Sequence, residues 1–237
     1  CRMGCRFCAS TLDGLVRNLS PGEMLGQVAA VNRMLEKEGR RVHNIVLMGS
    51  GEPLDNYDNT VKFLRLVNAP ERMNISLRNV SLSTCGLVPQ MRAFAEEKLP
   101  VTLCVSLHAP NDEVRRQLMP VANAYAIEDV IAAARAYVDK TGRRVIFEYA
   151  LVAGVNSQTR HADELALRLR ALRCHVNLIP LNAVRERELA PPSRREVDAF
   201  LHRLEARGVS ATVRREMGAD IQGACGQLRR SALEASD

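Results

Sequence analysis

Hydrophobic residues along the chain fall into short apolar runs that alternate with stretches in which apolar positions recur at helical spacing. The short runs predict buried strands at residues 43–48, 79–83, 101–107, 144–151, 175–179 and 209–213. The helical stretches occupy residues 20–39, 58–67, 88–97, 111–118, 127–139, 161–172 and 193–207. Apolar strands separated by helices are typical of βα repeats, so the pattern predicts an α/β fold with a parallel sheet.

The first predicted helix has a clear start. Ser20 is placed as an N-cap, Pro21 suits the first helical position, and Glu23 completes a capping box. No low-complexity tract or linker interrupts the chain, and the Pro191-Pro192 pair indicates a loop. We therefore expect a single domain over residues 1–237.

Polar side chains stand at or just beyond the carboxyl ends of the predicted strands. They are Glu52, Ser83, Ser106, His108 and Asn182. In parallel α/β folds ligands bind at that edge, because the strand ends and the following loops converge there. Any one of these residues alone is better explained as a turn residue or a helix cap. Five of them at the ends of four strands favour a binding site.

The chain opens with CRMGCRFC, which places Cys1, Cys5 and Cys8 on one short loop, with Gly4 giving the backbone freedom to fold. Thiolates ligate iron–sulfur clusters and zinc, and both normally take four ligands. With no fourth cysteine nearby, the triad favours a cluster with one iron open to another ligand. Zinc, or ordinary thiols and disulfides, are the alternatives.

The other four cysteines divide into two kinds. Cys85, Cys104 and Cys174 lie inside apolar stretches and are expected to behave as small buried apolar residues. Cys225 lies far downstream, in a loop after the last predicted strand. An odd total of seven cysteines fits a reducing compartment better than a disulfide scaffold, so we expect a cytoplasmic protein.

The amino-acid composition excludes some classes of function. The chain has 237 residues, of which 46% are hydrophobic and 25% charged, as in a globular protein, and it has no apolar run of the roughly 20 residues that a membrane helix needs. The net charge of +6 suits a polyanionic partner, although abundant arginine alone would produce it. With no Trp and 4% aromatic residues, a base-stacking platform for single strands is not expected.

At this point the chain resembles the radical S-adenosylmethionine (SAM) superfamily. The cysteine triad, with Phe7 just before Cys8, matches its C-x₃-C-x-φ-C signature, and residues 49–53, GSGEP, match its Gly-Glu-Pro motif. The resemblance narrows to the RlmN/Cfr-like adenine methyltransferases of large-subunit ribosomal RNA. The supporting strings are MGSGEPLDNYDN (48–59), LSTCGLVP (82–89), VSLHAPND (105–112), NLIPLN (177–182) and GADIQGACGQL (218–228).

The resemblance implies a partial (β/α)₆ barrel of the radical SAM type, and it assigns roles by position. Cys1, Cys5 and Cys8 would hold a 4Fe–4S cluster whose fourth iron is chelated by SAM. The SAM-binding positions would be Gly51, Glu52, Ser83, Ser106, Leu107, His108 and Asn182. Cys225 would carry a methyl group as a covalent intermediate.

The implied reaction has two stages, because the C2 and C8 carbons of adenine are too electron-poor to attack the SAM methyl. The Cys225 thiolate takes that methyl first. A radical made from a second SAM then removes hydrogen from the S-methyl group, and the resulting carbon radical adds to the ring. A second cysteine releases the product by forming a disulfide with Cys225, and an electron donor such as flavodoxin or ferredoxin supplies the reducing power.

The chain departs from the family at its start. The resolving cysteine and a proton-accepting glutamate lie upstream of the cluster loop in the family, as do the first barrel strand and a small accessory domain. Because the sequence begins on Cys1 without an initiator Met, we expect it to be a fragment. We expect methylation at C2 of an adenosine in ribosomal RNA, with transfer RNA as a further substrate in some relatives. The alternatives are C8 methylation and a non-catalytic iron–sulfur or zinc protein that binds RNA.

Overall fold

The structure is a computed structural model that describes residues 1–182, 184, 186–215 and 227. Within them one parallel sheet follows the order of the chain, so each strand pairs with the next one. Its strands are β1 (Ile45–Leu47), β2 (Val80–Thr84), β3 (Thr102–Ser106), β4 (Val145–Leu151), β5 (Cys174–Pro180) and β6 (Ala211–Val213). The described strands thus confirm the predicted parallel α/β sheet.

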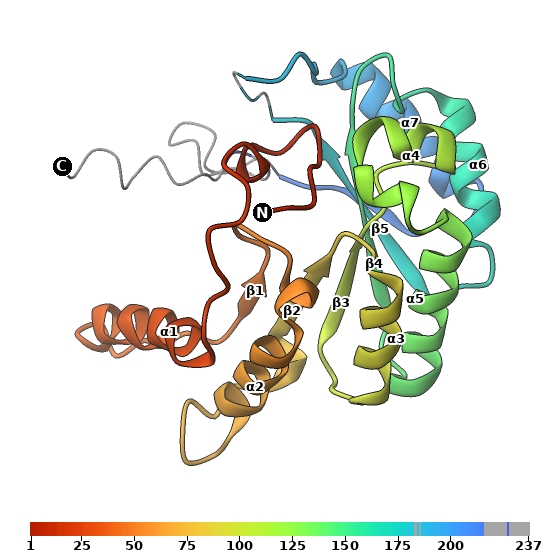
Figure 1. Ribbon diagram of the computed structural model, residues 1–237. Helices are drawn as coiled ribbons and strands as arrows, with labels where there is room; N and C mark the ends of the chain where they lie inside the picture. The colour runs from red at the N-terminus through yellow and green to blue at the C-terminus, as the bar shows by residue number, and fades with distance from the viewer. Residues whose placement is uncertain (183, 185, 216–226, 228–237) are drawn as a thin grey trace.

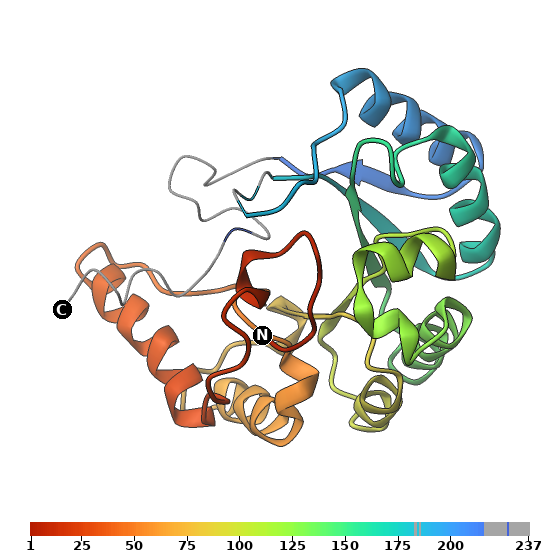
Figure 2. The same cartoon turned by 45° about the horizontal axis from the view of Figure 1, so that its top comes forward.

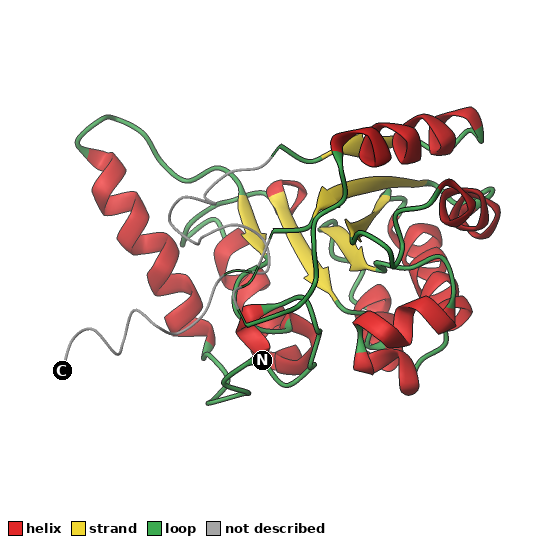
Figure 3. Cartoon of the chain, turned by 90° about the horizontal axis from the view of Figure 1, so that it is seen from above, coloured by secondary structure: helices red, strands yellow, loops and turns green. Residues whose placement is uncertain are grey.

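Helices connect the strands and lie along the outer side of the sheet, as Figures 1 and 2 show. They are α1 (Pro21–Glu36), α2 (Tyr57–Asn68), α3 (Val88–Glu96), α4 (Asp112–Leu118), α5 (Ile127–Thr141), α6 (Thr159–Leu169) and α7 (Arg194–Ala206). Seen from above, the strands stand in the middle with helices around them (Figure 3). This arrangement is the expected partial (β/α)₆ barrel, open between β1 and β6.

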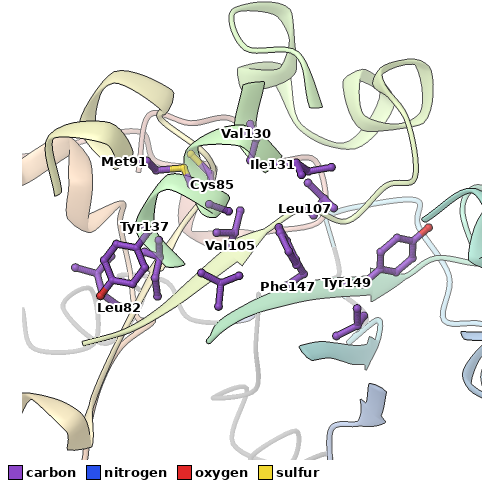
Figure 4. Packing of buried hydrophobic residues seen from close by; sticks show 14 of the residues in the cluster. Leu82, Cys85, Met91, Val105, Leu107, Val130, Ile131, Tyr137, Phe147 and Tyr149 are labelled. Atoms are coloured by element: carbon purple, nitrogen blue, oxygen red, sulfur yellow. The ribbon is translucent and has the colours of Figure 1, made fainter. Parts of the chain in front are cut away.

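The main core lies between the sheet and its helices. Figure 4 shows strand residues such as Leu82, Val105 and Phe147 facing Met91 of α3 and Tyr137 of α5. All five are fully buried. The Tyr137 hydroxyl lies 2.9 and 2.8 Å from the carbonyl oxygens of Leu99 and Val101, so its polar atom is not left unpaired. This core fixes the strand ends, and with them the candidate site.

The predicted start of the first helix is confirmed. The Ser20 hydroxyl accepts from the Glu23 amide at 3.2 Å, and the Glu23 carboxylate accepts from the Ser20 amide at 2.8 Å. Arg17 also donates to that carboxylate and, with the Ser20 bonds, lowers the pKa of Glu23 to about 2. The capping box therefore sets where α1 begins.

Two local features differ from the predicted pattern. The helix expected at residues 161–172 runs from Thr159 to Leu169, because Arg170 has a ψ of 135° that leaves the helical conformation, and Ala171 follows with a left-handed φ of 60°. Short 3₁₀ turns, among them η1 (Ala9–Thr11) and η2 (Pro53–Asn56), were not predicted. In the described part of the chain, no helix is both long and apolar enough to span a bilayer.

Candidate active site

The three cysteines of the opening motif lie on a loop that precedes η1. In Figure 2 this loop lies inside the arc that the helices form. The Arg6 amide donates to the carbonyl of Leu118, at the end of α4, at 2.9 Å. Gly4 has a φ of 73°, and a Cβ there would lie 3.3 Å from the Pro120 ring, so this turn favours glycine. The loop is therefore anchored to the carboxyl-terminal end of α4.

The thiols of this loop differ in exposure. Cys5 is buried and Cys1 and Cys8 are partly buried, and none forms a disulfide. Burial raises the pKa of Cys5 to about 12, so an uncoordinated Cys5 is a neutral thiol. Among the described residues no three Cys, His, Asp or Glu side chains are arranged to hold a single metal ion. A 4Fe–4S cluster binds each thiolate through a different iron, whereas zinc needs its ligands around one ion, so this cysteine loop fits a cluster better than zinc.

Glu52 of the Gly-Glu-Pro motif is held by backbone donors from two segments. Its Oε1 accepts from the Leu54 amide at 3.0 Å, and its Oε2 accepts from the Cys85 amide at 2.7 Å. Burial raises the pKa of Glu52, and these hydrogen bonds oppose that shift. A cationic ammonium group placed against the carboxylate would favour its charged form. Gly51 has a φ of 139°, a value that favours glycine.

The predicted residues of β2 and β3 meet on one side of the sheet. The hydroxyl oxygens of Ser83 and Ser106 lie 3.5 Å apart. Just beyond β3, the amides of Leu107 and His108 both donate to the carbonyl of Glu148, at 3.1 and 3.3 Å. The structure thus brings these four predicted residues together at the carboxyl ends of β2 and β3.

His108 has a strained backbone and a buried ring. Its φ is 56°, and its Nδ1 accepts from the Ala150 amide at 2.8 Å. The ring meets Phe7 of the cysteine loop edge-to-face, with centroids 4.8 Å apart. Burial lowers the pKa of His108 to about 3, with Arg115 adding to the effect, so the imidazole is neutral and its proton is on Nε2.

Asn156, a residue that the sequence did not single out, stabilises this turn. Its Nδ2 donates to the carbonyls of His108 and Ala150 at 2.8 and 2.6 Å, and its Oδ1 accepts from the Val152 amide at 2.6 Å. The side chain is fully buried. It therefore joins the end of β3 to the end of β4.

A row of polar residues crosses four strands on the same side of the sheet as Ser106. The strand register pairs Ser106 with Glu148, Glu148 with Asn177, and Asn177 with Thr212. Asn177 Nδ2 lies 3.4 and 3.3 Å from the two Glu148 oxygens, and burial raises the pKa of Glu148. Sequence analysis missed Glu148 because it sits within the apolar run 144–151. The available signal was the alternation of side chains between the two faces of a strand.

The remaining predicted residues are placed as follows. Asn182 is partly buried and follows β5, whose end is tied to β4 by the Leu181 amide, 3.2 Å from the Leu151 carbonyl. Cys85 and Cys104 are buried, as predicted, whereas Cys174 is only partly buried. Cys225 lies outside the described residues, and so does any disulfide that it would form.

Comparisons with known proteins identify the family. Residues 1–166 match the model of the Radical SAM superfamily. The "Probable dual-specificity RNA methyltransferase RlmN" of Clostridium perfringens (strain 13 / Type A) is 54% identical over 235 residues, which are 99% of this chain and 67% of that protein. The chain belongs to the RlmN family.

Two further comparisons agree. The protein of the same name from Alkaliphilus oremlandii is 55% identical over 234 residues, 99% of this chain and 67% of the relative. The crystal structure of a radical SAM methyltransferase from Sphaerobacter thermophilus superposes with a TM-score of 0.93 at 49% identity, covering 96% of this chain and 67% of that one. The RlmN-family chain is thus a radical SAM methyltransferase, and its cofactors are a 4Fe–4S cluster and SAM. The non-catalytic alternative is disfavoured.

Proposed function

We propose that this chain is the catalytic domain, over residues 1–237, of an enzyme that methylates C2 of an adenosine in large-subunit ribosomal RNA through a methyl-cysteine at Cys225. Transfer RNA is a second candidate substrate, and both would place the enzyme in the cytoplasm. The observation that carries the proposal is identity of 54% across 99% of the chain to a protein named as an RNA methyltransferase.

The site offers distinct places for the two cofactors. Cys1, Cys5 and Cys8 would each bind one iron of the cluster. The SAM-binding residues would be Gly51, Glu52, Ser83, Ser106, Leu107, His108 and Asn182. Glu52 suits the amino group of SAM because its carboxylate is fixed by two backbone amides. The serine hydroxyls and the row at Glu148 would face the more polar parts of the ligand.

Chemistry at Cys225 follows from its thiol. As a thiolate it would attack the SAM methyl carbon, so that an S–CH₃ bond forms at Cys225 and the sulfonium–methyl bond breaks. When bound, the reduced cluster and SAM supply the carbon radical that activates this methyl group. The chain's part is to orient the methyl-cysteine toward the adenine and to exclude water. Release of the product requires a second cysteine, which would form a disulfide with Cys225.

Basic residues near the site suit the phosphates of an RNA. Arg214 and Arg215 follow β6, and Arg194 and Arg195 begin α7, and all four are exposed. Arginine contacts to phosphate supply most of the affinity for nucleic acids. An external one-electron donor such as flavodoxin or ferredoxin would complete the set of partners.

The decisive experiment measures the mass of the Cys225 peptide from protein expressed with cluster assembly supported. We expect one added methyl, absent when Cys1 is replaced by Ala. RNA treated with the enzyme and methyl-labelled SAM is then digested, and the modified nucleoside is separated. 2-Methyladenosine supports the proposal, whereas 8-methyladenosine would move the reaction to C8. An unmodified Cys225 peptide in protein that contains iron and sulfide would rule out the methyl-cysteine route.

A further inference from the structure

Arg115, on α4, is an arginine with no exposed surface. Its Nη2 donates to the Cys85 carbonyl at 2.7 Å, its Nη1 donates to the Tyr125 carbonyl at 3.3 Å, and its Nε has no hydrogen-bond partner. In the described part of the chain no carboxylate forms an ion pair with it. Burying an arginine without a paired anion is energetically unfavourable, so this position calls for a compensating negative charge.

Three groups act on the guanidinium electrostatically without forming an ion pair with it in the described part of the chain: Cys5 on the cysteine loop, Cys85, and Asp112. One carboxylate oxygen of Asp112 accepts from the Ile127 amide at 2.7 Å. A permanent anion would appear beside Arg115 once Cys5 binds iron as a thiolate.

Arg115 also lies between three parts of the site: the cysteine loop, the loop at Cys85, and Glu52. Its helix holds the cysteine loop through the bond from the Arg6 amide to Leu118. Its guanidinium holds the Cys85 carbonyl, while the Cys85 amide donates to Glu52. Gly86 leaves room for it, since a Cβ there would lie 3.0 Å from Arg115 Nη2. The position of the charge relative to the cysteine loop is therefore fixed.

We propose that Arg115 is the buried counter-charge of the iron–sulfur cluster, placed beside Cys5 to offset the negative charge of the thiolate-bound cluster and so to ease its one-electron reduction. Net charge and hydrogen bonding around a cluster set its reduction potential. An electron from an external donor adds one negative charge, and a fixed cation nearby stabilises that reduced state in a low-dielectric interior. Arg115 is a positioning residue, since nothing requires it to touch SAM or RNA.

The test is a redox titration of the reconstituted cluster, followed by the EPR signal of the reduced form in the presence of redox mediators. Arg115→Gln removes the charge, Arg115→Lys keeps it, and Arg116→Gln is a matched control on the exposed side of the same helix. We expect Arg115→Gln to lower the ratio of reduced to oxidised cluster about tenfold at a fixed potential, which is about 59 mV for one electron. The other two variants should titrate like the parent. Iron and sulfide content are measured in each.

The other possible results also decide for or against the proposed counter-charge. If Arg115→Gln binds a full cluster at the parent potential, or if Arg115→Lys shifts as far as Arg115→Gln, the charge has no role and the proposal fails. If Arg115→Gln does not bind a cluster, the Arg115→Lys variant decides. A cluster in that variant with the reduction potential of the parent supports the counter-charge, and a cluster with a shifted reduction potential overturns it. Failure of both variants to bind iron would make Arg115 a purely structural residue.

Discussion

At the scale of single residues, Glu52 links the Gly-Glu-Pro motif to the loop after β2 through its two carboxylate oxygens. We expect Glu52→Gln to point an amide N–H₂ at one of the two backbone donors. The free energy of unfolding should fall by about 1–3 kcal/mol, the cost of an unsatisfied buried donor. SAM binding should weaken about tenfold or more, since a charge-assisted hydrogen bond is also lost. Urea unfolding and calorimetric titration with SAM measure the two effects.

The exposed Glu71 provides the matched control, because Glu71→Gln makes the same chemical change on the surface. Glu71→Gln should alter neither the free energy of unfolding nor the affinity for SAM. Unchanged SAM affinity in Glu52→Gln, with the expected loss of stability, would leave Glu52 a structural residue and remove it from the proposed SAM site.

His108 should make stability depend on pH. Its folded pKa of about 3 lies below the unfolded value near 6.5, so between these pH values the unfolded chain binds a proton that the folded chain does not. Stability therefore rises with pH through this window, by up to about 1.4 kcal/mol per pH unit from this residue, and falls as pH drops below about 6.5. His108→Gln keeps an acceptor for the Ala150 amide and should flatten the slope. Urea unfolding of the cluster-free chain from pH 4 to pH 7 measures it.

His202, which is exposed on α7, supplies the comparison. His202→Gln should keep the parent slope. A His108→Gln profile as steep as that of the parent would show that carboxylates, and not the buried imidazole, cause the acid sensitivity.

At the scale of elements, Asn156 fixes the ends of β3 and β4 relative to each other. Asn156→Ala leaves two carbonyls and one amide in the interior without a partner, and it also opens a small cavity. We expect a loss of about 3 kcal/mol or more in the free energy of unfolding. Because the His108 turn depends on the same bonds, SAM affinity should fall as well. Asn123→Ala, at an exposed position in the 3₁₀ turn after α4, should change neither.

The elements themselves follow closely from the sequence. All six described strands lie within or beside the predicted apolar runs, because strands covered by helices need continuous apolar sequence. Helix ends were less predictable: Leu172 continues the helical period, but Arg170 leaves the helical conformation with a ψ of 135° and ends the helix first. Local backbone geometry of this kind leaves no mark on the spacing of apolar residues.

The site was predictable only in part. The common placement of the strand-end residues from Glu52 to His108 was predictable because chain order puts them on one edge of the sheet. Arg115 and Asn156 were missed, since a polar residue in a helix or loop is expected to be exposed. Their burial arises from segments far apart in sequence, such as the loop at Cys85 that packs on Arg115 and the turn at His108 that packs on Asn156.

At the scale of the whole molecule, a hydrogen bond from a distant segment of the chain supports the cysteine loop. Arg187, in the segment between β5 and α7, donates to the Thr11 hydroxyl at 3.0 Å. That hydroxyl lies 3.1 and 2.8 Å from the carbonyls of Cys5 and Cys8. Thr11 and Arg187 therefore support the ligand loop without supplying a ligand. Outer partners of this kind commonly contribute about 10–100-fold to metal affinity.

We expect Thr11→Val and Arg187→Ala each to weaken retention of the cluster by about tenfold, because the ligand loop loses a fixed hydrogen-bond partner. The measurements are iron and sulfide per chain after a chelator challenge, and amide hydrogen exchange of the loop, which should speed up in both variants. Arg194→Ala is the control, since the Arg194 side chain is 96% exposed at the start of α7. If the two variants keep the cluster as long as this control does, the ligand loop is supported by its other contacts. The bond between Arg187 and Thr11 would then have no part in holding the cofactor.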